Sequence, residues 1–335
     1  MQLLWKNLED QNLRVKIRQN PENFVGHDGQ TALQKMILGA LDCLVTIASD
    51  LSRCHLLLAI NNHELTATLR LPEEQSLEPW LNSQNIIDFS ELLVLKNLSS
   101  YFTIDVQNQQ QFISQTYHDG LLKEKQQALF EGDFKKVSLR FIPDFKGFDS
   151  QPLPYGVFYN FCHQLAFLND GLIVELKENQ MQKNYFLFRQ GLVEYLYEQD
   201  EFSSRRRKPF YFEKQIQHVH VKVALSRNDQ GRIAASFANN LQTYQGGTHL
   251  EGLIDGALVA LNDYFKKQKN IAVFDEEKLL TRFDLAVAVK LPNAKYFGIT
   301  KLKLRNPEVH QLVEEAVADE FAIFLDRYPL WYKDK

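Results

Sequence analysis

Residues 241–252 read L-Q-T-Y-Q-G-G-T-H-L-E-G and follow an alternating apolar run over residues 234–240. Two adjacent glycines, a Thr-His pair and an acid two residues later predict a tight turn between a strand and a helix that starts near Glu251. Glycine suits this position because it lacks a Cβ and adopts positive φ at little cost. On spacing alone, the stretch is a turn that connects two elements.

Size, charge and cysteine usage limit the kind of protein this is. The 335 residues, 44% of them apolar, can form one large core or two ordinary ones, and the length favours two domains. A formal net charge of −4 argues against a general nucleic-acid binder, so any DNA contact has to come from a local patch. The three cysteines, Cys43, Cys54 and Cys162, have no C-x-x-C spacing, which is typical of buried free thiols and argues against a structural zinc site. Without a signal-peptide pattern or a run of about 18 apolar residues, we expect a cytoplasmic protein and no membrane partner.

Hydrophobic periodicity predicts helices and strands interleaved along the whole chain. We expect helices at residues 31–48, toward the end of 82–98, and at 155–168, 191–198, 250–269 and 307–328. We expect strands at residues 55–60, 64–71, 101–106, 111–117, 136–142, 172–176, 185–188, 210–215, 218–225, 231–239 and 284–290. Residues 144–154, rich in Gly, Pro and Asp, are the best boundary between two domains, 1–148 and 149–335, although a loop inside one domain would look the same.

The order of residues around the opening stretch is more specific than its spacing. Residues 236–253, S-F-A-N-N-L-Q-T-Y-Q-G-G-T-H-L-E-G-L, resemble the S-F-x-N-N-I-x-T-x-x-G-G-T-H-x-x-G-F signature of the transducer domain in type IIA topoisomerase B subunits, those of bacterial gyrase and topoisomerase IV. Residues 137–144, V-S-L-R-F-I-P-D, are similar to the family's T-x-V-x-F-x-P-D, and residues 164–171, Q-L-A-F-L-N-D-G, to its L-A-F-L-N-x-G. Residues 297–306, F-G-I-T-K-L-K-L-R-N, look like F-x-G-Q-T-K-x-K-L-x-N. The resemblance covers nearly the whole chain and is strongest from Lys136 onward.

The resemblance implies an α+β chain with two parts. The first is a GHKL-type (Bergerat) ATP-binding domain, a mixed sheet with helices on one face. The second is an α/β transducer domain of the ribosomal S5 domain 2-like kind, and no TOPRIM domain is expected within the 335 residues. In the transducer signature, formed by Gly246, Gly247, Thr248 and His249, we expect the histidine to tie the loop to neighbouring backbone rather than to catalyse a reaction.

The ATP-site motifs that the resemblance implies are degenerate in this chain. The family's helix reads E-V-V-D-N, with a Glu that activates water and an Asn that binds Mg²⁺, whereas residues 39–43 here read G-A-L-D-C. Gly39 has no side chain and the thiol of Cys43 is a poor Mg²⁺ ligand, so only Asp42 is kept. The family's D-x-G-x-G-I-P is T-L-R-L-P at residues 68–72, and residues 72–94, where the phosphate lid belongs, contain no glycine. We therefore expect no catalytic residue, no ATP hydrolysis and no cofactor, with Mg-ATP as the cofactor only if the site functions.

Three further features each have a functional and a structural interpretation. Lys301 matches the family lysine that reaches the γ-phosphate, but its partner Gln is Ile299 here, and a surface-loop lysine is the alternative. Asp42 would order a water in the adenine pocket or cap local backbone, and both interpretations stay open. The only dense basic run is either a solvated loop or a DNA-phosphate contact, and it comprises Arg205, Arg206, Arg207 and Lys208.

Three functional hypotheses follow. The first is a gyrase-B-like protein without ATP hydrolysis that acts as a scaffold and pairs with topoisomerase subunits or with itself, for example as a dimer. The second is a divergent ATP-dependent type II topoisomerase subunit, in which Asp42 and Lys301 are remnants of the site. The third is a DNA-binding module that uses residues 205–208 and binds with a steep salt dependence.

Overall fold

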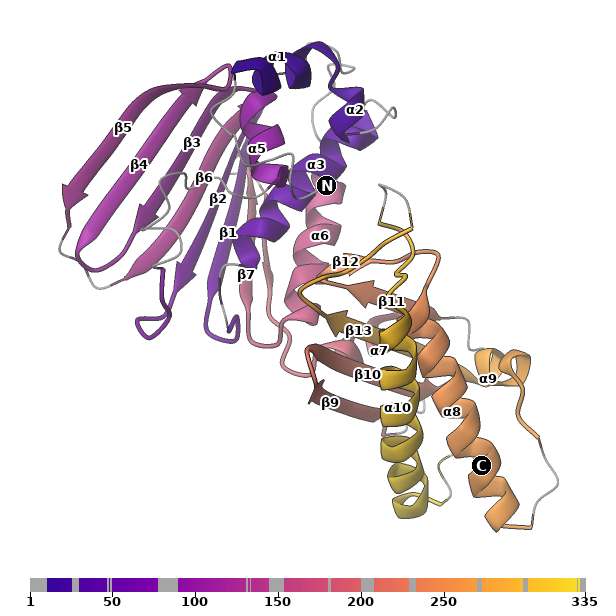
Figure 1. Ribbon diagram of the computed structural model, residues 1–335. Helices are drawn as coiled ribbons and strands as arrows, with labels where there is room; N and C mark the ends of the chain where they lie inside the picture. The colour runs from indigo at the N-terminus through magenta and orange to yellow at the C-terminus, as the bar shows by residue number, and fades with distance from the viewer. Residues whose placement is uncertain are drawn as a thin grey trace. The chain divides into compact units, whose positions relative to one another are not determined.

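The computed structural model shows a chain of two compact units, Met1–Phe188 and Arg189–Lys335, called here the first unit and the second unit (Figure 1). The structure describes residues 11–25, 30–46, 48, 50–77, 90–130, 132, 134–144, 154–179, 182–199, 208–228, 233–269, 273–297, 301–329 and 331. Both units contain helices and strands, as expected of an α+β chain. None of the helices in these ranges combines the length and the apolar character needed to cross a membrane.

The first unit is built on an eight-stranded mixed sheet with the strand order β5-β4-β3-β6-β2-β1-β7-β8. Neighbouring strands are antiparallel except for β1 and β7, which are parallel. The strands are β1 (His55–Asn61), β2 (Glu64–Leu71), β3 (Ser99–Gln107), β4 (Gln111–His118), β5 (Leu121–Leu129), β6 (Lys135–Pro143), β7 (Ile173–Glu178) and β8 (Gln182–Phe186).

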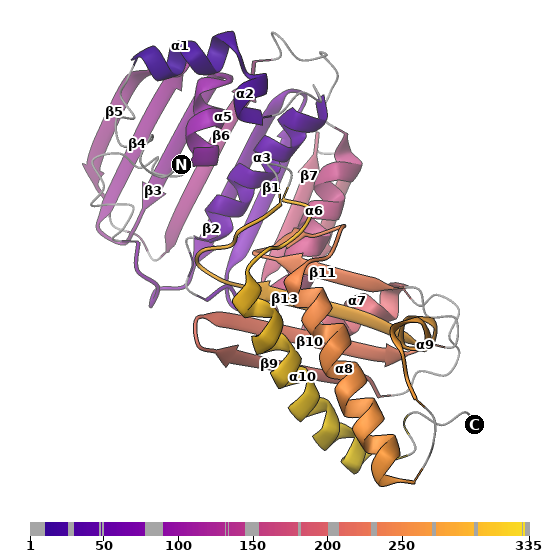
Figure 2. The ribbon, with the colours of Figure 1, turned by 45° about the vertical axis from the view of Figure 1, so that its right-hand side comes forward.

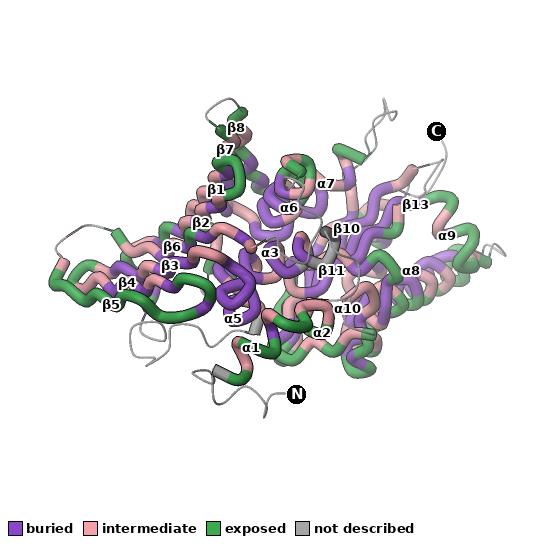
Figure 3. The backbone as a smooth tube through the Cα atoms, turned by 90° about the horizontal axis from the view of Figure 1, so that it is seen from above, coloured by how far each residue is buried: buried purple, intermediate pink, exposed green. Residues whose placement is uncertain are grey.

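Helices of the first unit lie on one face of this sheet, called here the covered face (Figure 3). They are α1 (Gln11–Gln19), α2 (Glu22–Val25), α3 (Gln30–Val45), α5 (Ser90–Asn97) and α6 (Tyr155–Leu168). The period-2 pattern of the strands explains the arrangement, since Leu56, Leu58 and Ile60 of β1 are buried while the residues between them are half-buried. In α3, Ile37, Leu41 and Leu44 recur at helical spacing and are buried. The opposite face, called here the open face, carries the intervening, more polar side chains.

The boundary between the units lies at residue 188 rather than at the expected 148. The reason is the parallel pairing of β7 with β1, in which His55 is opposite Ile173. A parallel neighbour requires a crossover connection, and α6 supplies it, so α6, β7 and β8 complete the first sheet. The stretch rich in Gly, Pro and Asp thus falls within the first unit rather than between the two units.

The second unit contains a five-stranded sheet with the order β12-β11-β13-β10-β9. Its strands are β9 (Phe210–Ile216), β10 (Val219–Arg227), β11 (Ala234–Ala238), β12 (Leu241–Gln242) and β13 (Phe283–Lys290), and its helices are α7 (Leu192–Gln199), α8 (Thr248–Lys267), α9 (Glu276–Arg282) and α10 (Pro307–Arg327). The long helices α8 and α10 run side by side (Figures 1 and 2). Their apolar sides and the sheet enclose one core that includes Leu253, Leu261, Val313 and Phe321.

Candidate functional site

The helix positions expected to carry ATP chemistry lie on α3, and a side chain from another helix reaches them. Glu91 is in the first turn of α5, and a Cβ added to Gly39 would lie 3.2 Å from Glu91 Cγ. The thiol of Cys43 donates a weak hydrogen bond to the Glu91 carboxylate, with Sγ 3.7 Å from Oε2. A carboxylate and a thiol therefore occupy the surroundings of positions 39 and 43, while Asp42 is half-buried on the same helix.

The end of β2 gives no sign of a nucleotide-binding loop. The strand continues regularly to Leu71, which pairs with Lys135 of β6, and Leu69 and Leu71 are buried. Residues 78–89, which lie in the interval where the family's phosphate lid belongs, are outside the described residues. The described residues do not fit Mg-ATP: position 39 lacks a carboxylate, position 43 offers a soft sulfur ligand, and an acid faces both.

Two expected remnants of the ATP site belong to different units. Asp42 lies in the first unit, and Lys301 lies in the second, where its Nζ is 6.0 Å from the centroid of the Tyr296 ring. Lys301 has φ 54°, a left-handed conformation that is uncommon for a residue with a side chain. Residues 298–300, just before Lys301, lie outside the described residues.

The G-G-T-H stretch forms a turn tied to the segment before α10. Gly246 and Gly247 have φ 68° and 129°, and Gly247 forms a bridge with Leu304. A Cβ at Gly247 would lie 2.4 Å from the backbone oxygen of Leu304, so the close approach itself requires glycine. Thr248 begins α8 directly after the turn.

Polar residues of the same signature form a buried network beneath the turn. His249 is fully buried, and its Nε2 lies 3.1 Å from Thr243 Oγ1, which in turn lies 2.7 Å from Ser236 Oγ. Asn239 donates to the carbonyl of Leu291 and accepts from its N–H, both at 2.8 Å. His249 thus contacts a side-chain hydroxyl, where a backbone contact was expected, and the arrangement holds the turn in place.

Only one residue of the basic run can be located. Lys208 Nζ donates to the hydroxyl of Tyr328 at 2.9 Å, and its carbonyl accepts from Trp331 Nε1 at 2.7 Å. Lys208 is therefore held against the residues that follow α10. The predicted contacts of Arg205, Arg206 and Arg207 lie outside the described residues.

Comparison with known proteins shows that the chain is similar to the B subunits of type IIA topoisomerases. The family model described as DNA gyrase B matches residues 191–333. The DNA gyrase B subunit of Clostridium acetobutylicum is 30% identical over 249 residues, which cover 70% of this chain and 38% of that protein. The chain is a type IIA topoisomerase B-subunit-like protein. A second relative, the DNA gyrase B subunit of Borreliella burgdorferi, is 27% identical over 249 residues, 71% of this chain and 39% of that protein. The gyrase-B-like chain thus spans less than two fifths of the length of these relatives.

Solved structures agree with the fold along almost the whole gyrase-B-like chain. The 43K ATPase domain of Thermus thermophilus gyrase B has a TM-score of 0.79 at 22% identity, covering 98% of this chain and 93% of that one. The ATP-binding domain of Francisella tularensis topoisomerase IV has a TM-score of 0.72 at 21% identity, covering 94% of this chain and 92% of that one. At such identity the likeness shows the fold alone, and it includes both units.

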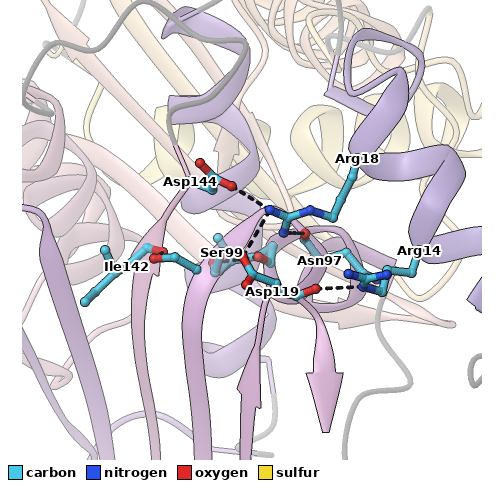
Figure 4. Close-up of polar contacts among 9 residues, drawn as sticks. Arg14, Arg18, Asn97, Ser99, Asp119, Ile142 and Asp144 are labelled. Atoms are coloured by element: carbon cyan, nitrogen blue, oxygen red, sulfur yellow. Dashed lines mark hydrogen bonds and ion pairs between the residues drawn. The ribbon is translucent and has the colours of Figure 1, made fainter.

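An arginine of the gyrase-B-like protein connects its first helix to one end of the first sheet (Figure 4). Arg18 donates to the carbonyl of Asn97 at 2.8 Å and pairs with Asp119 at 3.2 Å and Asp144 at 2.5 Å. Arg14 adds a hydrogen bond from Nε to the carbonyl of Asp119 at 2.7 Å. The ends of α5 and β6 and the turn between β4 and β5 thus meet at one side chain, and no sequence pattern predicted this meeting point.

We expect Arg18→Met to destabilise the gyrase-B-like protein by about 1–3 kcal/mol, because it removes the ion pair that Arg18 forms with the largely buried carboxylate of Asp144. Urea unfolding followed by circular dichroism measures the change. Arg53→Met is the matched control, since the Arg53–Glu74 pair is exposed, with 63% and 58% of the two side chains accessible, and should cost less than about 1 kcal/mol. Equal losses in the two variants would contradict the role assigned to Arg18.

The buried histidine predicts a pH dependence. Burial lowers the pKa of His249 to about 3, against about 6.5 in an unfolded chain. As the pH falls below about 6.5, the unfolded chain gains a proton that the folded chain cannot take, so the free energy of unfolding decreases by up to about 1.4 kcal/mol per pH unit. The contribution of the neutral, buried His249 to stability is therefore fully present above about pH 6.5 and is lost as the pH falls below that value.

Urea titrations between about pH 7.5 and 5.5 test the part of this window that lies above the ordinary titration range of carboxylates. A hydrogen bond from His220 lowers the pKa of Glu213 to about 2, so its contribution is lost only at more acidic pH. His249→Gln should lower the stability at neutral pH and flatten the slope. An unchanged slope in this variant would assign the pH dependence to other groups.

Proposed function

We propose that this gyrase-B-like protein has lost ATP hydrolysis and nucleotide binding and acts as a non-catalytic scaffold that binds another protein. The observation that carries the proposal is the position of Glu91, whose side chain approaches Gly39 and whose carboxylate accepts from Cys43. The thiol at position 43 is a poor ligand for the Mg²⁺ that accompanies a triphosphate, and the carboxylate next to it comes from α5 and already accepts a hydrogen bond from that thiol. The regular continuation of β2 to Leu71 supports the same conclusion.

The partner we propose is a B-type topoisomerase subunit or a second copy of this chain, in the cytoplasm. The support is that the relatives are named as subunits, and the chain matches the fold of such proteins along both units. Light scattering after size exclusion tests self-association, because the chain mass is 39.0 kDa and a dimer has twice that mass. A monomer that also fails to bind a B-type subunit would contradict the scaffold role.

One observation favours a second function, that of a divergent ATP-dependent type II topoisomerase subunit. The side chain of Glu91 on α5 lies close to Gly39 of α3, the position at which the family has its general base. If the site is rebuilt around this residue, Glu91 would orient the attacking water, and Asp42 would be a remnant of the site on α3. A DNA-binding module based on residues 205–208 has less support, since Lys208 is engaged with Tyr328.

Calorimetry with MgATP, MgADP and a non-hydrolysable analogue distinguishes the two functions. We expect no saturable heat at nucleotide concentrations on the order of millimolar, the range of weak binding. Saturable, Mg²⁺-dependent binding with hydrolysis that Glu91→Gln abolishes would support the enzyme instead. Glu74→Gln is the control, because Glu74 is an exposed carboxylate of the same unit that pairs with Arg53.

A further inference from the structure

The open face of the first sheet carries two cations directly opposite one another. Arg70 of β2 is the cross-strand partner of Lys136 of β6, so both side chains project from the same face. His55 of β1 is the partner of Arg70 on its other side. The three residues therefore form one row across three adjacent strands, with neighbouring strands roughly 4.8 Å apart.

The two cations share an aromatic side chain. The guanidinium carbon of Arg70 and the Nζ of Lys136 lie 5.9 and 5.8 Å from the centroid of the Phe134 ring, which is 43% exposed. Cation–π contacts of this kind hold both charged groups near one spot at the surface. The row is therefore ordered as well as accessible, with Arg70 exposed and Lys136 half-buried.

The acidic side chains that the structure describes on this face form no ion pair with either cation. Within the described ranges, neither Arg70 nor Lys136 forms an ion pair, whereas Arg140 on the same face pairs with Glu64 at 2.8 Å. Residues 131 and 133, both acidic, lie outside the described residues. Like charges directly opposite one another destabilise a sheet, so an uncompensated pair is expected where an anion supplies the missing charge.

The acid near the end of the row has cations of its own. Glu175 Oε2 lies 3.4 Å from His55 Nε2, while its Oε1 is held by Lys177 and Lys183 at 3.0 and 2.7 Å. The hydrogen bonds from Lys183 and Lys177 outweigh the effect of burial and lower the pKa of Glu175 to about 2, so it stays a carboxylate that is already paired. The charge of Glu175 is thus neutralised by cations other than Arg70.

We propose that Arg70 and Lys136 form a phosphate-binding site on the open face of the first unit. Arg70 supplies the planar, multiply donating guanidinium and Lys136 the point charge that together suit a phosphoryl oxyanion, and His55 extends the row. The site lies on the face opposite α3, so it is separate from the degenerate nucleotide site and does not depend on the proposed function. The ligand is a free phosphate or the phosphodiester of a single-stranded nucleic acid, since both present the same oxyanion.

Two probes test the site. Pyrophosphate without Mg²⁺ is titrated by calorimetry at low ionic strength. Binding of a labelled single-stranded oligonucleotide is followed by fluorescence anisotropy. We expect saturable binding that is weakened about tenfold or more in Arg70→Gln/Lys136→Gln. Lys123→Gln/Lys125→Gln is the matched control, because it removes the same charge from the exposed strand β5 of the same unit and should leave binding unchanged. If only pyrophosphate binds, the ligand is a small phosphate. If both probes bind and both are weakened by Arg70→Gln/Lys136→Gln, the ligand is the phosphodiester.

The resonance of the Arg70 side-chain Nε–H provides a test in the unmodified protein, should the double variant not fold. It should shift saturably on addition of pyrophosphate, whereas the corresponding resonance of Arg53, which is paired with Glu74, should not. Equal weakening in the two double variants, or no saturable response of the wild-type protein to either probe, would overturn the proposal.

Discussion

Gly256→Ala is expected to destabilise the protein by roughly 3 kcal/mol, the upper end of the usual cost of overpacking. A Cβ at Gly256 would lie 2.4 Å from the backbone oxygen of Glu314 and 2.9 Å from Val317 Cβ. Gly252, one turn earlier on α8, has the same relation to the backbone oxygen of His310, also at 2.4 Å. Because the obstacle is main chain, a side-chain rotation cannot relieve the contact, and α8 and α10 have to move apart.

Urea unfolding of the variant, followed by far-ultraviolet circular dichroism, measures this loss. Gly156→Ala in α6 is the matched control, since a Cβ there meets nothing within 4 Å. Alanine is favoured over glycine inside a helix by about 0.5–1 kcal/mol, so the control should be neutral or slightly stabilised. Similar effects at the two positions would show that the close approach of α8 and α10 does not limit stability.

Much of the fold could be predicted because local patterns and burial coincide. β1 and β2 form where expected, and Asn62 between them has φ 57°, which an asparagine in a tight turn tolerates. Helix α6 has the predicted bounds because its apolar residues are continuous and Pro154 precedes it. Strand β5 was not predicted, since every residue of L-L-K-E-K-Q-Q-A-L is exposed and no burial pattern marks it.

The unit boundary shows a second limit of local sequence. Gly, Pro and Asp mark a loop, but they do not reveal which sheet the next strand joins. That β7 pairs with β1 depends on a contact between residues far apart in the chain. Composition alone therefore placed the boundary before α6 instead of after β8.

The candidate site was predictable only in its local part. Gly39 and Cys43 could be identified as replacements because they fall at fixed spacings in one helix. Glu91 could not, because it comes from α5 and meets α3 only in the folded chain. The Arg18 network was missed for the same reason, since its acceptors come from three separate elements.

We expect Gly247→Ala to lower the free energy of unfolding by roughly 4 kcal/mol, because the cost of backbone strain adds to that of overpacking. At φ 129° the backbone is in a region that residues with a Cβ rarely adopt, which costs about 1–3 kcal/mol. The new Cβ would also lie 2.4 Å from the oxygen and 2.5 Å from the nitrogen of Leu304. Leu304 is fully buried, so the bridge cannot open without exposing core.

Gly246→Ala separates the two costs, because the neighbouring glycine has positive φ without the main-chain obstacle. Its φ is 68°, and a Cβ there would meet the flexible Leu250 Cδ2 at 3.0 Å. The left-handed conformation costs about 1–2 kcal/mol, and Gly246→Asn should recover part of this, since asparagine tolerates that region. The free energy of unfolding measured in urea should therefore be much lower for Gly247→Ala than for Gly246→Ala. It should also be lower for Gly246→Ala than for Gly246→Asn. If Gly247→Ala were no worse than Gly246→Ala, the turn would tolerate a wider separation from Leu304, and the signature glycine would be required for its φ alone.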